Sequence, residues 1–166
     1  MFKADFDKPT WQKLSVKRDR KHEPLVKKLC TNEDGHKPVF TYIKDLMIFA
    51  AMVGFSANKR KKLEVDGISI ILETYASDHK DSFIYLIALI TEKNALALKD
   101  ENLANSITIF EEYCNAGLEE VQLWLDENPG DYSGIDTLAD KVYEQVVKNE
   151  SSMKAVDDPE ALEVEF

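Results

Sequence analysis

The stretch Phe40–Lys62 constrains the fold most strongly, because an apolar helix in it runs directly into a cluster of positive charge. Residues 46–53 read LMIFAAMV and contain no charged side chain. A helix that is apolar on every side is covered on most sides by other elements. Gly54 predicts the end of this helix, since glycine is common just past a helix C-terminus. Four cations follow at 59–62, so a buried helix is expected to present a basic loop.

Other segments have the apolar spacing of helices. A second strongly apolar helix is expected at 82–93, as the natural partner of the helix that starts near Phe40. Gly117 predicts a break between two later helices. The remaining amphipathic helices are expected at 24–30, 100–114, 118–127 and 133–148.

Two segments do not follow a helical pattern. Residues 15–22, SVKRDRKH, have neither helical nor strand periodicity, which indicates an extended arm or an exposed first turn. Residues 63–73 combine a turn signal, Asp66-Gly67, with β-branched side chains, which is typical of a short strand. The sequence therefore predicts a mainly α, single-domain, bundle-like fold of five to six helices, with room for one short strand pair.

The chain length of 166 residues suits one compact domain followed by a tail. We expect a helical domain over 1–148. Residues 149–166 are acidic with scattered apolar side chains, which indicates a disordered acidic tail. The apolar pattern at 161–166 could still dock on a partner.

The net charge of −10 is distributed unevenly along the chain. Residues 1–62 carry 15 Lys and Arg against 7 Asp and Glu, whereas residues 63–166 carry 6 against 24. Such asymmetry suggests a polyanion-facing end and a partner-facing end. The alternative is that the two halves fold against each other and their charges cancel.

Two short basic clusters are the strongest functional candidates. Cations held on a rigid scaffold can contact DNA phosphates without reading a base sequence. The alternative is an ordinary solvated surface. The candidate nucleic-acid-binding residues are Lys17, Arg18, Arg20, Lys21, Lys59, Arg60, Lys61 and Lys62.

Catalytic and metal-binding patterns are not found in the sequence. It contains no GxGxxG, Walker, HExxH or GxSxG motif, and its three histidines lie in polar segments without ligand spacing. Neighbouring carboxylates such as Glu111-Glu112 point about 100° apart on a helix, so solvated faces are expected there. We expect no catalytic residue, metal or cofactor, with a small metal-dependent nuclease kept as an alternative. The spacing of Cys30 and Cys114 predicts two free, buried thiols.

No apolar run reaches the ~18 residues that a membrane-spanning helix requires. The N-terminus, MFKADFDKPTW, has no apolar signal-peptide region. We therefore expect a cytoplasmic protein without membrane contact.

Two blocks, TYIKDLMIFAAMVGF–KRKKLE and ITIFEEYCNAGLEEVQLWLDENPGD, resemble the small Dnd system-associated proteins, family four, which are encoded beside DNA phosphorothioation genes. Val16-Lys17-Arg18-Asp19 also fits, and the resemblance extends to about Tyr132. Cys114, where alanine is expected, and the dense KRKK cluster depart from the pattern. The resemblance implies an accessory protein of a bacterial defence system that marks or restricts DNA; it supplies neither an activity nor site residues.

Together these features predict a non-catalytic accessory factor. Its basic clusters would contact the DNA backbone, and its acidic helices would hold another protein of the Dnd system. A pure protein-interaction module without nucleic-acid contact is the main alternative.

Overall fold

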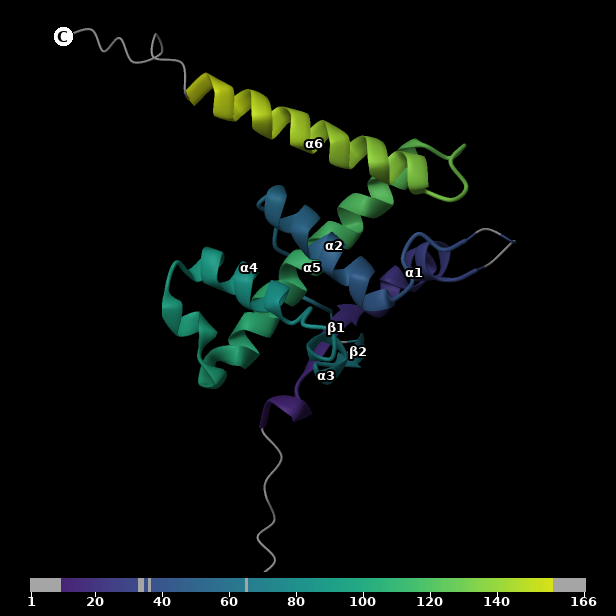
Figure 1. Cartoon of the computed structure of the whole chain (residues 1–166). Helices are drawn as coiled ribbons and strands as arrows, with labels where there is room; N and C mark the ends of the chain where they lie inside the picture. Colours follow the sequence, from purple (N-terminus) through teal and green to yellow (C-terminus); the bar gives the residue numbers. More distant parts are fainter. Residues whose placement is uncertain (1–9, 33–34, 36, 65, 157–166) are drawn as a thin grey trace, which may run out of the picture.

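The computed structural model describes residues 10–32, 35, 37–64 and 66–156, which form six α-helices and one two-stranded sheet (Figure 1). The predicted mainly α fold with one strand pair is confirmed. The helices are α1 (Glu23–Cys30), α2 (Ile43–Ser56), α3 (Glu73–Ala76), α4 (Ser82–Glu92), α5 (Leu103–Glu127) and α6 (Ile135–Val156). The strands are β1 (Ser15–Asp19) and β2 (Gly67–Ile71), and short 3₁₀ helices are η1 (Thr10–Lys13), η2 (Arg20–His22), η3 (Ala95–Leu98) and η4 (Asp100–Asn102).

The long helix α5 is the centre of the fold. Helices α2, α4 and α6 and strand β1 all pack against it. Phe110, Leu118 and Val121 of α5 are completely buried. The expected pairing of the two most apolar helices is therefore wrong, since α2 and α4 both pack chiefly on α5.

Two glycines allow α2 and α5 to approach closely. A Cβ atom on Gly54 would lie 2.1 Å from the carbonyl oxygen of Tyr113, and one on Gly117 would lie 1.7 Å from that of Ala50. Both distances are far below van der Waals contact, so any side chain would push the helices apart. The prediction that these glycines end or break helices is wrong: α2 continues to Ser56, and α5 is continuous through Gly117.

The N-terminal basic segment forms a strand instead of the predicted arm or exposed turn. β1 pairs with β2 in antiparallel register, with Ser15 opposite Ile71 and Asp19 opposite Gly67. Val16 and Arg18 are buried and Lys17 between them is exposed, as the alternation of a strand requires. The arginine at an inward position hides this alternation in the sequence.

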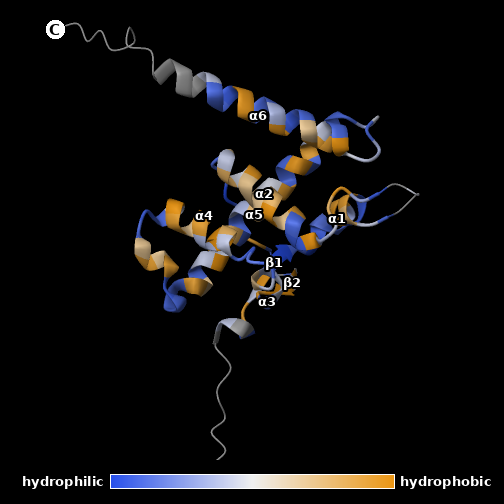
Figure 2. Ribbon diagram, viewed as in Figure 1, coloured by the Kyte–Doolittle hydropathy of each residue, from blue (hydrophilic) through white to orange (hydrophobic). Residues whose placement is uncertain are grey.

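Helix α6 is fixed to the body at its start and extends away from it (Figure 1). Leu138 is buried, whereas every described residue from Val142 to Ser151 is exposed. The helix continues over 149–156, where a disordered tail was expected, because no helix-breaking residue occurs before Pro159. Residues 157–166 of that predicted tail lie outside the described residues. Figure 2 shows hydrophobic and hydrophilic residues mixed along α6.

Candidate interaction surfaces

The basic segment 59–62 is fastened to α5 by hydrogen bonds. The backbone N–H of Lys61 donates to the carbonyl oxygen of Glu112 at 3.0 Å. The buried carboxamide of Asn115 donates to the carbonyl oxygens of Lys61 and Lys62 at 3.3 and 3.1 Å. The segment therefore has a defined position, as the sequence predicted for a loop held on a rigid scaffold.

The side chains of this segment pair with carboxylates that project from α5. Arg60 also lies over the ring of Tyr113, with its guanidinium carbon 5.4 Å from the ring centroid. The ion pairs are Lys59–Glu120 at 2.8 Å, Arg60–Glu112 at 2.6 Å and Lys61–Glu119 at 2.5 Å. Glu112, Glu119 and Glu120, for which the sequence predicted solvated faces, are thus partners of the basic segment.

The cations of the first cluster are also paired. Arg18 is 2% exposed and donates to Glu23 at 2.6 Å. The exposed guanidinium of Arg20 lies 2.7 Å from Asp66. Lys21 lies within 4.0 Å of three carboxylates, and its hydrogen bond to Glu119 raises its pKa. These three partners are Glu119 at 2.9 Å, Glu64 at 3.0 Å and Asp19 at 3.7 Å.

Charges within the two clusters therefore largely cancel. Six of the eight candidate cations form ion pairs with seven different carboxylates. Of the eight, Lys17 and Lys62 have exposed side chains for which no ion pair is found among the described residues. The structure brings both clusters to the same side of α5, since Glu119 bonds both Lys21 and Lys61.

His22 and Asn115 are structural residues that the sequence did not single out for a role. The Nε2 atom of His22 lies 2.8 Å from Oδ1 of Asn115, and both residues are buried. Burial lowers the pKa of His22, so the neutral imidazole is favoured. The only sequence feature that could have indicated this role is that Asn115, a polar residue, occupies an inward position in an apolar helical stripe.

Glu111 and Glu112 have separate structural roles. The Oε1 atom of Glu111 accepts the backbone N–H of Lys17 at 2.7 Å, and Glu112 pairs with Arg60. Burial raises the pKa of Glu111 to about 7. Within the described part of the chain, no three His, Cys, Asp or Glu residues are grouped so as to hold a metal ion.

The remaining predicted sulfur and histidine sites are unremarkable. Both cysteines are free thiols; Cys114 is buried and Cys30 is half-buried. Burial raises the pKa of Cys30 to about 11. His79 lies in a turn with a φ of 62°, and His36 is outside the described residues.

An acidic corner forms where α5 turns into α6. It surrounds a hollow of about 500 Å³ whose carboxylates are Glu127, Asp131, Asp136, Asp140 and Glu144. Asp131 makes the corner rigid by accepting the backbone N–H groups of Gly134 and Thr137 at 2.9 and 2.8 Å.

Within the described part of the chain, most carboxylates of this corner lack the cationic partners that the carboxylates near the basic clusters have. Lys141 lies 3.7 Å from Glu127. In the described regions of the chain, no ion pair is formed by Asp136, Asp140 or Glu144, and all three are exposed. The acidic corner therefore carries uncompensated negative charge.

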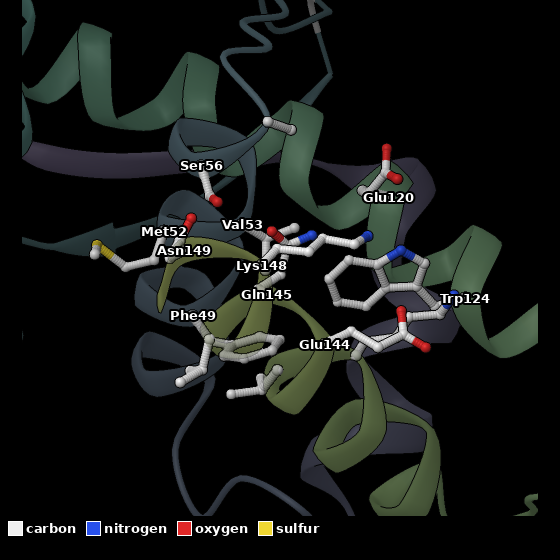
Figure 3. Close-up of a pocket in the computed structure, with 14 residues that line it drawn as sticks. Phe49, Met52, Val53, Ser56, Glu120, Trp124, Glu144, Gln145, Lys148 and Asn149 are labelled. Carbon is white, nitrogen blue, oxygen red and sulfur yellow. The ribbon is translucent and has the colours of Figure 1, made fainter. Parts of the chain in front are cut away.

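An apolar groove lies farther along α6, between α2, α5 and α6 (Figure 3). Its volume is about 480 Å³, and it is open to solvent. Phe49 and Trp124 contribute aromatic rings to it, and Val142 and Val146 form part of its α6 wall.

A comparison with protein families identifies the chain. A family model described as DNA sulphur modification system-associated protein 4 matches residues 15–158. The chain belongs to this family. The matched range of this Dnd system-associated protein includes both basic clusters, the acidic corner and α6, and it confirms the resemblance seen in the sequence. No curated protein and no solved structure shows significant similarity to the chain.

One further property concerns membranes. Across the residues that the structure describes, no helix is both long enough and apolar enough to cross a bilayer.

Proposed function

We propose that this Dnd system-associated protein is a non-catalytic, cytoplasmic accessory factor that binds another protein of the DNA phosphorothioation system through its acidic corner. The partner surface would be basic. The proposal keeps the predicted contact through acidic helices and assigns it to one end of α5 and the start of α6.

The observation that carries the proposal is the contrast between paired and unpaired charge. Near the basic clusters, cations and carboxylates neutralise each other at 2.5–3.7 Å. At the acidic corner, Asp136, Asp140 and Glu144 face solvent instead. An uncompensated patch of one sign attracts a partner of the opposite sign and accelerates its association.

The rigidity of the corner also supports this role. Asp131 fixes the α5–α6 connection by bonding the backbone at Gly134 and Thr137. Burial opposes ionisation of Asp131, but these hydrogen bonds lower its pKa below the usual range. A preorganised charged surface loses less conformational entropy when a partner binds.

The test is a binding measurement with the purified proteins of the DNA phosphorothioation system, each immobilised in turn. Changing Asp136→Asn together with Asp140→Asn should weaken binding of the recognised protein by about tenfold. The control pair, Glu92→Gln on α4 with Glu101→Gln in η4, makes the same charge change outside the acidic corner. Equal affinities for both variants, or no binding to any of these proteins, would contradict the proposal.

Contact with the DNA backbone is a second candidate function. It is favoured by Lys17 and Lys62, whose exposed side chains have no ion pair within the described ranges. Non-specific contact of this kind weakens with salt by roughly 0.9 log units per log salt for each neutralised phosphate. Duplex binding at low salt that is lost in Lys17→Ala with Lys62→Ala would support it, and no duplex binding by the wild-type protein would exclude it.

A further inference from the structure

Helix α6 leaves an apolar stripe uncovered beyond its first turn. Ile135, Ala139, Val142, Val146 and Asn149 follow one another at intervals of four, three, four and three residues. This is the heptad spacing of a coiled-coil seam. Val142 and Val146 are 44% and 49% exposed, so the seam lacks a packing partner in the isolated chain. A helix gains most of its stability from packing an apolar face, which indicates that another element covers this one.

The groove beside this seam offers the complementary surface. Its apolar lining from α2 and α5 consists of Phe49, Met52, Val53 and Trp124. Figure 3 shows Phe49 and Trp124 lining the groove together with the α6 residues Gln145 and Lys148. The volume of about 480 Å³ accommodates several side chains from a second helix.

One molecule thus carries a helical ridge and an apolar groove on the same face. A face that contains both can pair with an identical face about a two-fold axis, and such isologous pairs close without further growth. The chain's own α6 does not fill the groove: Leu138 is buried near the start of this helix, but Val142 and Val146 stay exposed.

The charges along α6 favour an antiparallel arrangement of two copies. Its first half carries Asp136, Asp140 and Glu144 with one lysine, Lys141, whereas its second half carries Lys148 and, in the sequence, Lys154 with one glutamate, Glu150. Antiparallel helices place each acidic half opposite a half that contains lysines; parallel helices would place the acidic halves together. Asn149 provides a polar position in the seam, which can fix the register of a helical pair.

We infer that the α6 seam and the groove form an antiparallel two-fold interface between two copies of this chain. The interface covers the apolar stripe of α6 and fills the space beside Trp124.

Sedimentation equilibrium of the full chain without any partner tests the inference. The wild-type protein should be dimeric, and Val142→Glu with Val146→Glu should make it monomeric without loss of helical circular dichroism, because both positions are exposed. The matched control is Leu86→Glu with Ile90→Glu on α4, where the replaced side chains are 44% and 46% exposed. This control should remain dimeric.

A wild-type protein that stays monomeric over a wide concentration range would overturn the inference, and so would a dimer that survives the two α6 substitutions. Either result would leave the acidic-corner proposal standing, since that proposal is tested by partner binding of the Asp136 and Asp140 variants.

Discussion

The imidazole of His22 and the carboxamide of Asn115 meet at 2.8 Å inside the protein, where they join η2 to the middle of α5. The same carboxamide donates to the carbonyl oxygens of Lys61 and Lys62. Asn115 therefore connects the two basic clusters to one helix and keeps their cations beside the carboxylates of α5. Buried polar networks of this kind are stable only when each member is satisfied.

Replacing Asn115 with alanine should lower the free energy of unfolding by about 2–3 kcal/mol, because buried partners lose their hydrogen bonds. Urea denaturation measures this change. The amide of Lys61 should also exchange faster with solvent, since the segment is no longer clamped. The control is Asn105→Ala on the exposed face of α5, which should stay within about 0.5 kcal/mol of the wild type. Equal effects of the two substitutions would contradict the role of Asn115.

Gly117→Ala should be among the most destabilising single substitutions in α5. Its Cβ would lie 1.7 Å from the carbonyl oxygen of Ala50, so α2 and α5 must separate. We expect a loss of at least about 2 kcal/mol, measured by thermal and urea denaturation. Gly130→Ala is the control, because no heavy atom lies within 4 Å of the added methyl group. A Gly117→Ala protein with wild-type stability would show that the helices do not cross here.

Ionisation of Glu111 should make the free energy of unfolding fall as the pH rises from about 4.5 to about 7. Burial raises its pKa to about 7 in the folded protein, from a usual value of 4.5. Between these values the folded state binds the proton more tightly than the unfolded state, so the unfolding free energy decreases with increasing pH. Glu111→Gln keeps an acceptor for the N–H of Lys17 and removes the charge. It should be more stable than the wild type at pH 8 and similar to it near pH 4.5.

Glu111→Gln must be compared with the wild type because His22 makes the free energy of unfolding change with pH in the opposite direction. Burial lowers the pKa of His22, so its contribution to stability is lost as the pH falls below the ordinary histidine value. The contribution of His22 is the same in the wild type and in Glu111→Gln, so it cancels in the comparison. A stability difference between them that does not change with pH would contradict the assignment to Glu111.

Glu119→Ala with Glu120→Ala should increase non-specific DNA binding. These carboxylates pair with Lys59 and Lys61, which would become free to contact phosphate, whereas Lys21 keeps Glu64 and Asp19 as partners. The slope of log affinity against log salt should become steeper by about 2, at roughly 0.9 per added contact. Asp126→Ala with Asp140→Ala makes the same change in net charge without freeing these lysines, and should have the smaller effect. Indistinguishable duplex titrations of the two variants would show that the ion pairs do not control DNA contact.

The helical character of the chain was predictable because apolar spacing and turn residues mark most helices. The way in which the helices pack against one another was not predictable from the sequence. Gly54 and Gly117 carry the same local signal whether a glycine ends a helix or allows two helices to touch. Only the packing of α2 on α5 distinguishes these cases.

The basic clusters were predictable as charge but not as ion pairs. Lys61 and Glu119 are far apart in sequence, and nothing local to either residue indicates that they meet at 2.5 Å. The strand β1 was missed because Arg18 occupies an inward position that the strand pattern assigns to apolar residues. The cancellation of charge between the two halves of the chain was considered as an alternative, and the observed ion pairs support it for these clusters.

The most direct test of the account is the rate at which the protein associates with the Dnd system protein that it recognises, measured at increasing salt concentration. Uncompensated carboxylates at Asp136 and Asp140 predict an association rate constant that falls steeply as salt rises, and a weaker dependence when both are changed to asparagine. A rate constant that does not vary with salt, or that varies equally in both proteins, would contradict the claim that the acidic corner is the binding face.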